Sequence, residues 1–102
     1  VTDKELRIID VDALLKTAWE LYKKQKFDEA LADCKKAAEL EPKDFRPHYI
    51  AGLIYMAKQD FKTASDSFAK AIELKPDEKV IYIYKGQADR ERGAKEDAIA
   101  TW

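Results

Sequence analysis

The sequence is poor in the residue types that build catalytic and metal sites. Among its 102 residues it has one cysteine, Cys34, and one histidine, His48. A single cysteine excludes an intrachain disulfide and a metal site made of several cysteines. A glycine-rich phosphate loop, a zinc-ligand spacing and a marked Ser-His-Asp order are also missing. We therefore expect no enzyme activity and no requirement for a metal or cofactor.

An excess of charge of either sign is missing as well. Lysine and arginine number 19 and aspartate and glutamate 20, which leaves a net charge of −1. Nucleic-acid binding through the phosphate backbone needs a basic excess, so we expect no nucleic-acid partner. A membrane-spanning helix needs about 20 mostly apolar residues, and the sequence has no such run. No residue pattern indicates a compartment, and the cytoplasm is our default expectation.

What the sequence has in abundance is the pattern of amphipathic helices. Charged residues make up 38% of the chain, and there are only three glycines and three prolines. Apolar residues recur at spacings of three and four, as at Leu14, Ala18 and Leu21, which indicates one face of a helix. Breaks are expected at residues 24–26 and at Pro42, because proline cannot continue the helical hydrogen-bond ladder. The predicted helices are 11–25, 28–40, 45–58, 61–74, 79–92 and 95–102.

The chain also repeats itself at a fixed step of thirty-four residues. Pro42 and Pro76 stand at this distance, and so do Gly52 and Gly86. The segments around them match in order: Lys24-Gln25, Phe27 and Ala30 correspond to Lys58-Gln59, Phe61 and Ala64. A series of matches in one register indicates a repeat architecture, in which each unit is a helical hairpin that buries its apolar face against its neighbours.

The repeat resembles the tetratricopeptide (TPR) pattern of small, aromatic and proline positions. The matching residues of the second copy are His48, Ala51, Gly52, Tyr55, Ala64, Phe68, Ala71 and Pro76. In the first copy they are Leu14, Thr17, Ala18, Leu21, Ala30, Cys34, Ala37 and Pro42, and in the third Tyr82, Lys85, Gly86, Asp89, Ala98 and Trp102. The resemblance covers residues 11–102. It implies an all-α solenoid of helical hairpins, a right-handed superhelix with about two and a half to three repeats.

This register divides the chain into four segments. Residues 1–10 are an N-terminal lead, 11–44 and 45–78 are the first two repeats, and 79–102 is a partial third repeat. The lead could cap the first repeat, lie in the groove, pair with another molecule or be disordered. Lys85 and Asp89 stand in the third unit at positions where apolar residues are expected, so they should pack loosely, meet a partner or meet each other. We expect a piece of a longer array, with an apolar end face near Trp102.

The resemblance also implies where a partner binds, because the first helix of each unit lines a concave groove in TPR-like folds. The predicted groove is apolar and aromatic at its centre and polar at the third unit, and it holds aromatic and Met residues of the kind enriched in interfaces. We expect it to bind an amphipathic helix or an extended apolar segment of another protein. Burial of some of these residues between adjacent units is the structural alternative, above all for Leu53, Ile83 and Val80. The predicted groove residues are Leu15, Trp19, Tyr22, Tyr49, Leu53, Met56, Ile83, Gln87 and Arg90.

Other functions are weaker predictions from the same residues. A clamp for the terminal carboxylate of a chaperone tail is not expected, because the matching positions hold Leu15, Trp19, Ile50, Val80 and Tyr84, none a cation or an amide. His48 is predicted to be a packed or half-exposed structural residue, and Cys34 a buried apolar one. Self-association through the C-terminal end or through residues 1–10 is the main alternative function.

Overall fold

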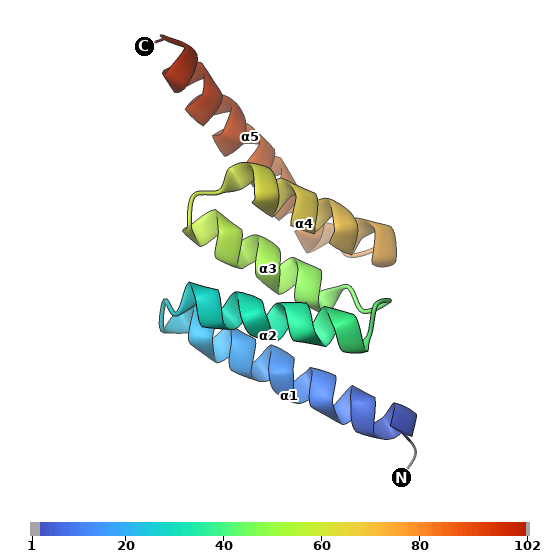
Figure 1. Cartoon of the computed structure of the whole chain (residues 1–102). Coiled ribbons are helices and arrows are strands. Elements are labelled where there is room, and N and C mark those ends of the chain that lie inside the picture. The colour runs from blue at the N-terminus through green and yellow to red at the C-terminus, as the bar shows by residue number, and fades with distance from the viewer. Residues whose placement is uncertain (1–2, 102) are drawn as a thin grey trace.

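The structure, a computed structural model, describes the backbone of residues 3–101 and the side chains of residues 11–94. Within this part of the chain the ordered elements are all helices (Figure 1). They are α1 (Asp3–Lys23), α2 (Phe27–Leu40), α3 (Arg46–Ala57), α4 (Phe61–Leu74) and α5 (Lys79–Thr101). Each connection between them is short, so consecutive helices run antiparallel.

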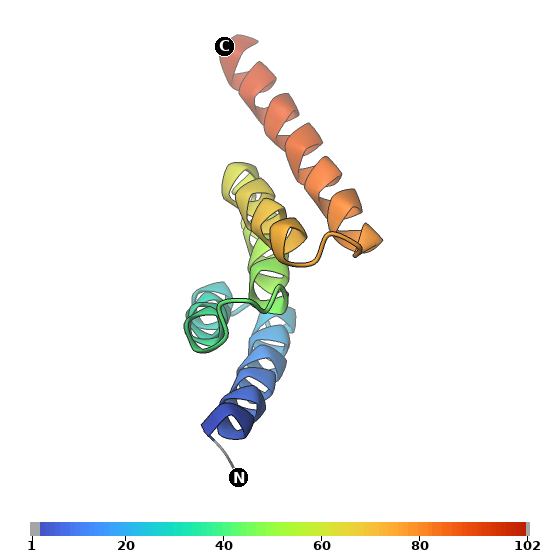
Figure 2. The ribbon, with the colours of Figure 1, turned by 90° about the vertical axis from the view of Figure 1, so that its right-hand side faces the viewer.

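The helices stack in chain order. α1 packs against α2, α2 against α3, α3 against α4 and α4 against α5, and the first helices of successive units also touch, α1 with α3 and α3 with α5. α1 and α5 lie at opposite ends of the stack, and the C-terminal part of α5 projects past α4 (Figures 1 and 2). The predicted all-α fold of helical hairpins in a repeat solenoid is confirmed.

The two hairpin turns have the same geometry, as the sequence repeat predicts. Gln25 and Gln59 both take a left-handed backbone conformation with φ of 64°. In each turn the next residue donates its backbone N–H to a carbonyl five residues earlier, from Lys26 to Leu21 and from Asp60 to Tyr55, both at 2.9 Å. This six-to-one bond closes the end of a helix when one residue adopts that conformation. The side chain of Asp60 then caps α4 by accepting from the Thr63 N–H at 3.4 Å.

The core of the second hairpin depends on a close approach between α3 and α4. A Cβ atom built on Gly52 would lie 2.5 Å from the ring of Phe68, so only glycine fits at this position. Phe68 is fully buried and lies near the rings of Tyr49 and Tyr84, at centroid distances of 6.3 and 5.9 Å. The equivalent positions of the first hairpin hold a larger Ala18 and a smaller Cys34, both buried in the first core cluster. The two hairpins therefore fill the same space with different pairs of residues.

Two predicted helix boundaries were wrong. α1 begins at Asp3, eight residues before the predicted start at residue 11, because no Gly or Pro interrupts the chain there and Asp3 and Glu5 suit a helix N-terminus. The predicted helices 79–92 and 95–102 are one continuous helix, α5, through Thr101. The backbone of the lead segment is thus helical from Asp3, whereas the predicted roles of its side chains, and the apolar end face at Trp102, lie outside the described residues.

The continuity of α5 has a physical reason in the residues of the third repeat. The first two turns are fixed by apolar contacts: Phe27 packs against Tyr22 at a ring distance of 6.2 Å, and Tyr55 packs in the second core cluster. The third repeat has Lys95 in the place of Phe27 and Phe61, and Asp89 in the place of Tyr55. Without apolar residues to hold a turn, helix propagation continues, because each added residue gains a backbone hydrogen bond.

Candidate functional site

The first helices of the three units frame an apolar hollow of about 290 Å³. α1, α3 and the start of α5 supply its walls, so the hollow lies on the face that the repeat pattern predicts to be concave. Its floor is made of Leu15, Ile50 and Ile81, which are at most 8% exposed and belong to the core. Its rim includes Trp19 and Val80, with 38% and 40% of their surface exposed. The full lining is Leu15, Trp19, Phe45, Arg46, Tyr49, Ile50, Glu78, Val80 and Ile81.

Trp19 is held in place on the rim by its own helix. Its ring stacks on Tyr22 with a centroid distance of 5.5 Å, and the Lys23 ammonium lies 5.9 Å from the Trp19 ring. A cation over an indole face is attracted by the ring's negative face. With these neighbours in contact, Trp19 still has 38% of its surface exposed. Such preorganised aromatics are the usual anchors of protein interfaces.

Tyr49 lies deeper and joins the groove to the core. Its ring packs against Phe68 and Tyr84, and it is only half-buried. Burial, together with the neighbouring Tyr84, raises the pKa of the Tyr49 hydroxyl above its ordinary value. The hydroxyl is therefore neutral throughout the physiological range, and Tyr49 contributes apolar surface and a hydrogen-bonding group to the hollow.

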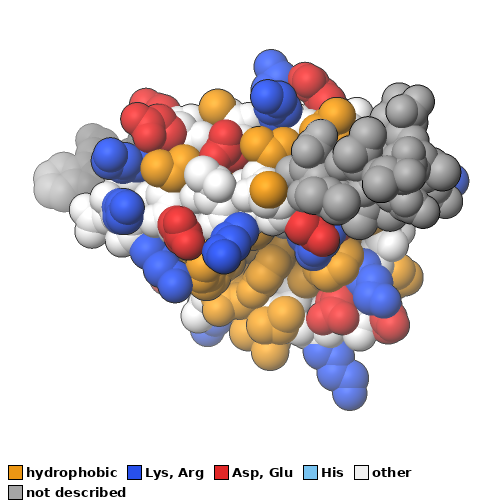
Figure 3. All heavy atoms as spheres, turned by 90° about the horizontal axis from the view of Figure 1, so that it is seen from below, with side chains coloured by type: hydrophobic (Ala, Val, Ile, Leu, Met, Phe, Trp, Pro, Cys, Tyr) orange, Lys and Arg blue, Asp and Glu red, His pale blue; other side chains and the backbone are white. Residues whose placement is uncertain are grey.

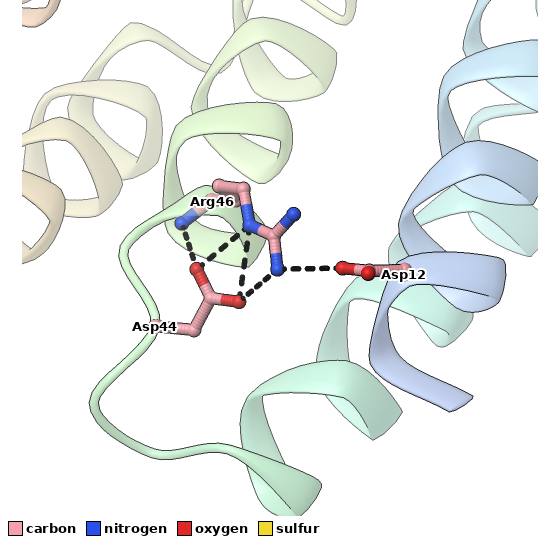
Figure 4. Close-up of polar contacts among 3 residues, drawn as sticks. All are labelled: Asp12, Asp44 and Arg46. Atoms are coloured by element: carbon pink, nitrogen blue, oxygen red, sulfur yellow. Dashed lines mark hydrogen bonds and ion pairs between the residues drawn. The ribbon is translucent and has the colours of Figure 1, made fainter. Parts of the chain in front are cut away.

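An ion cluster borders the hollow where α3 begins (Figure 4). The Arg46 guanidinium donates to both carboxylate oxygens of Asp44, at 2.7 to 3.1 Å, and reaches Asp12 on α1 at 2.9 Å. The Arg46 backbone N–H also donates to Asp44 at 3.0 Å. Burial by itself would raise the pKa of Asp44, but these bonds and the charge of Arg46 outweigh it and hold that pKa below its ordinary value. The cluster ties the first repeat to the second and carries a net negative charge.

The predicted groove residues do not all reach this hollow. Leu15, Trp19 and Tyr49 line it together. Leu53 is 7% exposed and belongs to the core, as the structural alternative expected, and Leu15 is only 5% exposed. Tyr22 and Met56 are half-buried beside it, while Gln87 and Arg90 are exposed further along α5. Ile83 is 63% exposed and is not buried between units.

Several lining residues were missed by sequence reasoning. Phe45, Arg46 and Glu78 sit at the ends of helices rather than on a regular helical face, so the periodicity of three and four does not find them. The signal for Arg46 was the order Asp44-Phe45-Arg46-Pro47, an acid just before a helix with proline near its start. That order is typical of a helix N-terminus whose first free N–H is bonded by the acid.

Cys34 and His48, the two residues that could suggest chemistry, both have shifted pKa values. Burial raises the pKa of the Cys34 thiol to about 12, and Asp33 adds to this, so Cys34 is a poor nucleophile. Burial and the nearby Lys70 lower the pKa of His48, which favours the neutral imidazole. Across the described residues no three His, Cys, Asp or Glu side chains are grouped to hold a metal. No helix in the same part of the chain is long and apolar enough to cross a membrane.

Comparison with known proteins gives the family. The family model described as "Tetratricopeptide repeat" matches residues 15–79. The chain belongs to the tetratricopeptide repeat family. Human tetratricopeptide repeat protein 13 is 30% identical over 77 residues, which cover 76% of this chain and 9% of that protein. The BBSome complex member BBS4 homolog of Drosophila melanogaster is 32% identical over 78 residues, covering 76% of this chain and 16% of that protein.

A relative from Arabidopsis thaliana, an uncharacterised TPR repeat-containing protein, is 43% identical over 53 residues, covering 52% of this chain and 7% of that protein. The chain therefore spans less than a fifth of the length of each of these relatives. The tetratricopeptide family indicates a protein-interaction scaffold, and the shared segment is the repeat itself.

Proposed function

We propose that this chain is a non-catalytic scaffold that binds an apolar or amphipathic segment of another protein in its concave groove. The observation that supports this most is the hollow framed by α1, α3 and α5, with a buried apolar floor and an exposed Trp19 at its rim. In Figure 3 hydrophobic side chains gather below the helix nearest the viewer, with charged side chains around them. Aromatic anchors surrounded by polar groups are typical of interface centres.

The size of the hollow limits what it can hold. A volume of about 290 Å³ is at the lower end of ligand pockets, which range over about 300–1,000 Å³. It fits one or two large apolar side chains rather than an extended cofactor. The occupant is therefore an anchor residue such as Leu or Phe on a peptide or helix, and the rest of the partner lies along the exposed faces of α1 and α5.

The charges at the rim favour a basic residue next to this anchor. Asp12 and Asp44 share the Arg46 guanidinium, and Glu78 adds a third carboxylate. These three carboxylates outnumber the two cations at the rim, Arg46 and the Lys23 that lies over Trp19. Because Arg46 is already bonded to two carboxylates, it offers little to an anionic partner, whereas the excess negative charge attracts Lys or Arg. The proposed ligand is an apolar anchor with a neighbouring cation, which differs from an acidic tail.

The test is selection of peptides from a displayed library of random 12-residue sequences on the immobilised chain. The proposal predicts recovered peptides with a large apolar residue near Lys or Arg. Binding should fall by about tenfold or more in a Trp19→Ala, Val80→Ala variant, because loss of an interface anchor costs at least 1.4 kcal/mol. Tyr82→Ala is the matched control, since Tyr82 is an aromatic residue with 48% exposure that does not line the hollow. Equal binding by both variants would place the site elsewhere.

A further inference from the structure

One face of α5 lacks the helix that the repeat pattern places against it. Tyr82, Gly86 and Gly93 recur at spacings of four and seven, so they lie on one side of the helix. Tyr82 is 48% exposed, and a Cβ atom on Gly86 or Gly93 would meet nothing within 4 Å. At the equivalent Gly52, the ring of Phe68 fills this space. A different side of α5 is packed, since Ile81 and Ala88 are fully buried in the second core cluster.

The sequence contains the segment that would cover this face. Thirty-four residues after Ala64 and Phe68 stand Ala98 and Trp102. In the second repeat, the helix with Ala64 and Phe68 packs on the Gly52 face. The backbone of residues 95–101 is helical, as such a packing helix must be, and it continues α5 without a break. The side chains of this segment lie outside the described residues, so the correspondence rests on the sequence register.

A straight α5 cannot cover its own face. Its C-terminal part points away from the stack, past the end of α4 (Figures 1 and 2). To fold back, the helix would have to open at Gly93 and lose backbone hydrogen bonds on both sides of the break. The new turn would also have Lys95 where Phe27 and Phe61 hold the other two turns. A second copy of the chain meets neither obstacle, because its α5 can lie antiparallel to the first with both helices intact.

We propose that two copies of the chain exchange the C-terminal parts of α5, so that residues 95–101 of each complete the third repeat of the other. In the second repeat, Asp60 in the turn stands halfway along the sequence between the packed residues Gly52 and Phe68. In the third repeat, the residue halfway between Gly86 and Trp102 is Ala94, which is next to Gly93. The two α5 helices therefore cross at Gly93 on a two-fold axis, where the absence of a side chain lets their backbones approach. This is the isologous geometry of an exchanged dimer, in which the same patch serves both copies.

The first test is the mass of the chain in solution, measured by sedimentation equilibrium over a range of concentrations. The proposal predicts a reversible change from the 11.7 kDa monomer to a dimer. A monomer at every concentration would overturn the proposal. Residues 95–101 that fold back within one chain would give this result.

The second test identifies the surface that forms the dimer. Gly86→Leu introduces no clash in the single copy, because the position is open, but it blocks the space for the second copy. Dimerisation should weaken by about tenfold or more, as expected for overpacking at a helix contact. Gln87→Leu is the control, since it adds the same side chain at the next exposed position and should leave dimerisation unchanged. A dimer insensitive to Gly86→Leu would contradict the proposal.

The third test uses the predicted symmetry. In a Gly93→Cys variant the two introduced thiols lie close to the axis and should form a disulfide under mild oxidation, giving a covalent dimer. Cys34 does not interfere, because it is buried and its pKa is about 12. Lys62→Cys on the exposed side of α4 is the control and should remain largely uncoupled at the same dilution. A dimer that does not couple at residue 93 would have another interface.

Discussion

At the scale of single residues, the fold depends on a few pairs of facing residues whose side chains must together fill a fixed space between two helices. Gly52 and Phe68 are one such pair, and Ala18 and Cys34 occupy the equivalent space in the first repeat. Phe68 is fully buried between Tyr49 and Tyr84, so it has little freedom to move away from a larger neighbour. The three glycines of the chain therefore differ in role, although they look alike in the sequence.

Replacing Gly52 with alanine should lower the free energy of unfolding by about 1–2 kcal/mol. Overpacking costs about 1–3 kcal/mol, and the better helix propensity of alanine returns at most about 1. Gly86→Ala is the matched control: with nothing within 4 Å, it should raise the free energy of unfolding by about 0.5–1 kcal/mol. Urea denaturation of both variants below the dimerisation range checks this, and equal effects of the same sign would refute the assigned packing.

His48 should make stability depend on pH near neutrality. Burial and Lys70 lower its pKa in the folded chain, so the unfolded chain binds a proton at a higher pH than the folded one does. Stability should therefore rise with pH between roughly 5 and 7, where the unfolded histidine titrates. His48 and Tyr82 occupy the same position of the repeat, so tyrosine is a suitable replacement. In a His48→Tyr variant, this part of the dependence of stability on pH should vanish. A slope unchanged by the substitution would assign the effect to other groups.

At the scale of elements, α5 is docked on α4 by a polar contact as well as by its apolar side. The hydroxyl of Ser65, which is 6% exposed, donates to the Asp89 carboxylate, and Lys85 pairs with the other oxygen of Asp89 at 2.9 Å. Of the three alternatives predicted for Lys85 and Asp89, the structure shows the one in which they meet each other. The hydrogen bond from Ser65, followed by the charge and hydrogen bond of Lys85, lowers the pKa of Asp89.

Loss of this carboxylate should loosen α5 more than loss of its cation. Asp89→Ala is expected to lower the free energy of unfolding by about 1 kcal/mol, because it leaves the buried Ser65 hydroxyl without its charged acceptor. Lys85→Ala should cost less than about 0.5 kcal/mol, since an exposed ion pair contributes little. Amide hydrogen exchange in α5 measures the loss of helix stability in each of the two variants. A larger effect of Lys85→Ala would mean that the ion pair, and not the bond to Ser65, holds the helix.

The same contact should weaken in acid. Because the folded pKa of Asp89 lies below its ordinary value, its contribution to stability is present above the unfolded pKa, near 3.9, and is lost as pH falls through the folded pKa. Asp44 behaves in the same way through Arg46. The protection of α5 amides in wild type and Asp89→Ala should therefore begin to converge as pH falls below about 4. A difference that persists at lower pH would argue against an ionic contact.

The turns between helices could be predicted from the sequence in two of the three repeats. The thirty-four-residue register correctly predicted the first two hairpins and the breaks near Gln25 and Gln59, because these depend on contacts that recur in both units. It failed at Gly93, which stands at the same register as the two turn glutamines and suits a left-handed conformation better than they do. Tertiary contacts decide whether a turn forms, and Lys95 and Asp89 cannot supply the apolar ones.

At the scale of the whole molecule, the stack brings residues far apart in sequence to one surface. Trp19, Tyr49 and Val80 come from three helices and line one hollow. The charged border made by Asp12, Asp44 and Arg46 could not be predicted, because it depends on the distance between α1 and the start of α3 rather than on a repeat position. Whether this hollow binds a partner stays a prediction.

The most direct measurement of that claim is a fluorescence titration with Trp19 as the single indole. The chain has two tryptophans, so Trp102→Phe leaves Trp19 as the reporter. Adding a selected peptide should shift the emission of Trp19 to shorter wavelength, because an apolar anchor in the hollow removes water from a side chain that is 38% exposed. The shift should saturate at the binding constant of the peptide. Saturable binding that leaves the emission of Trp19 unchanged would contradict the account.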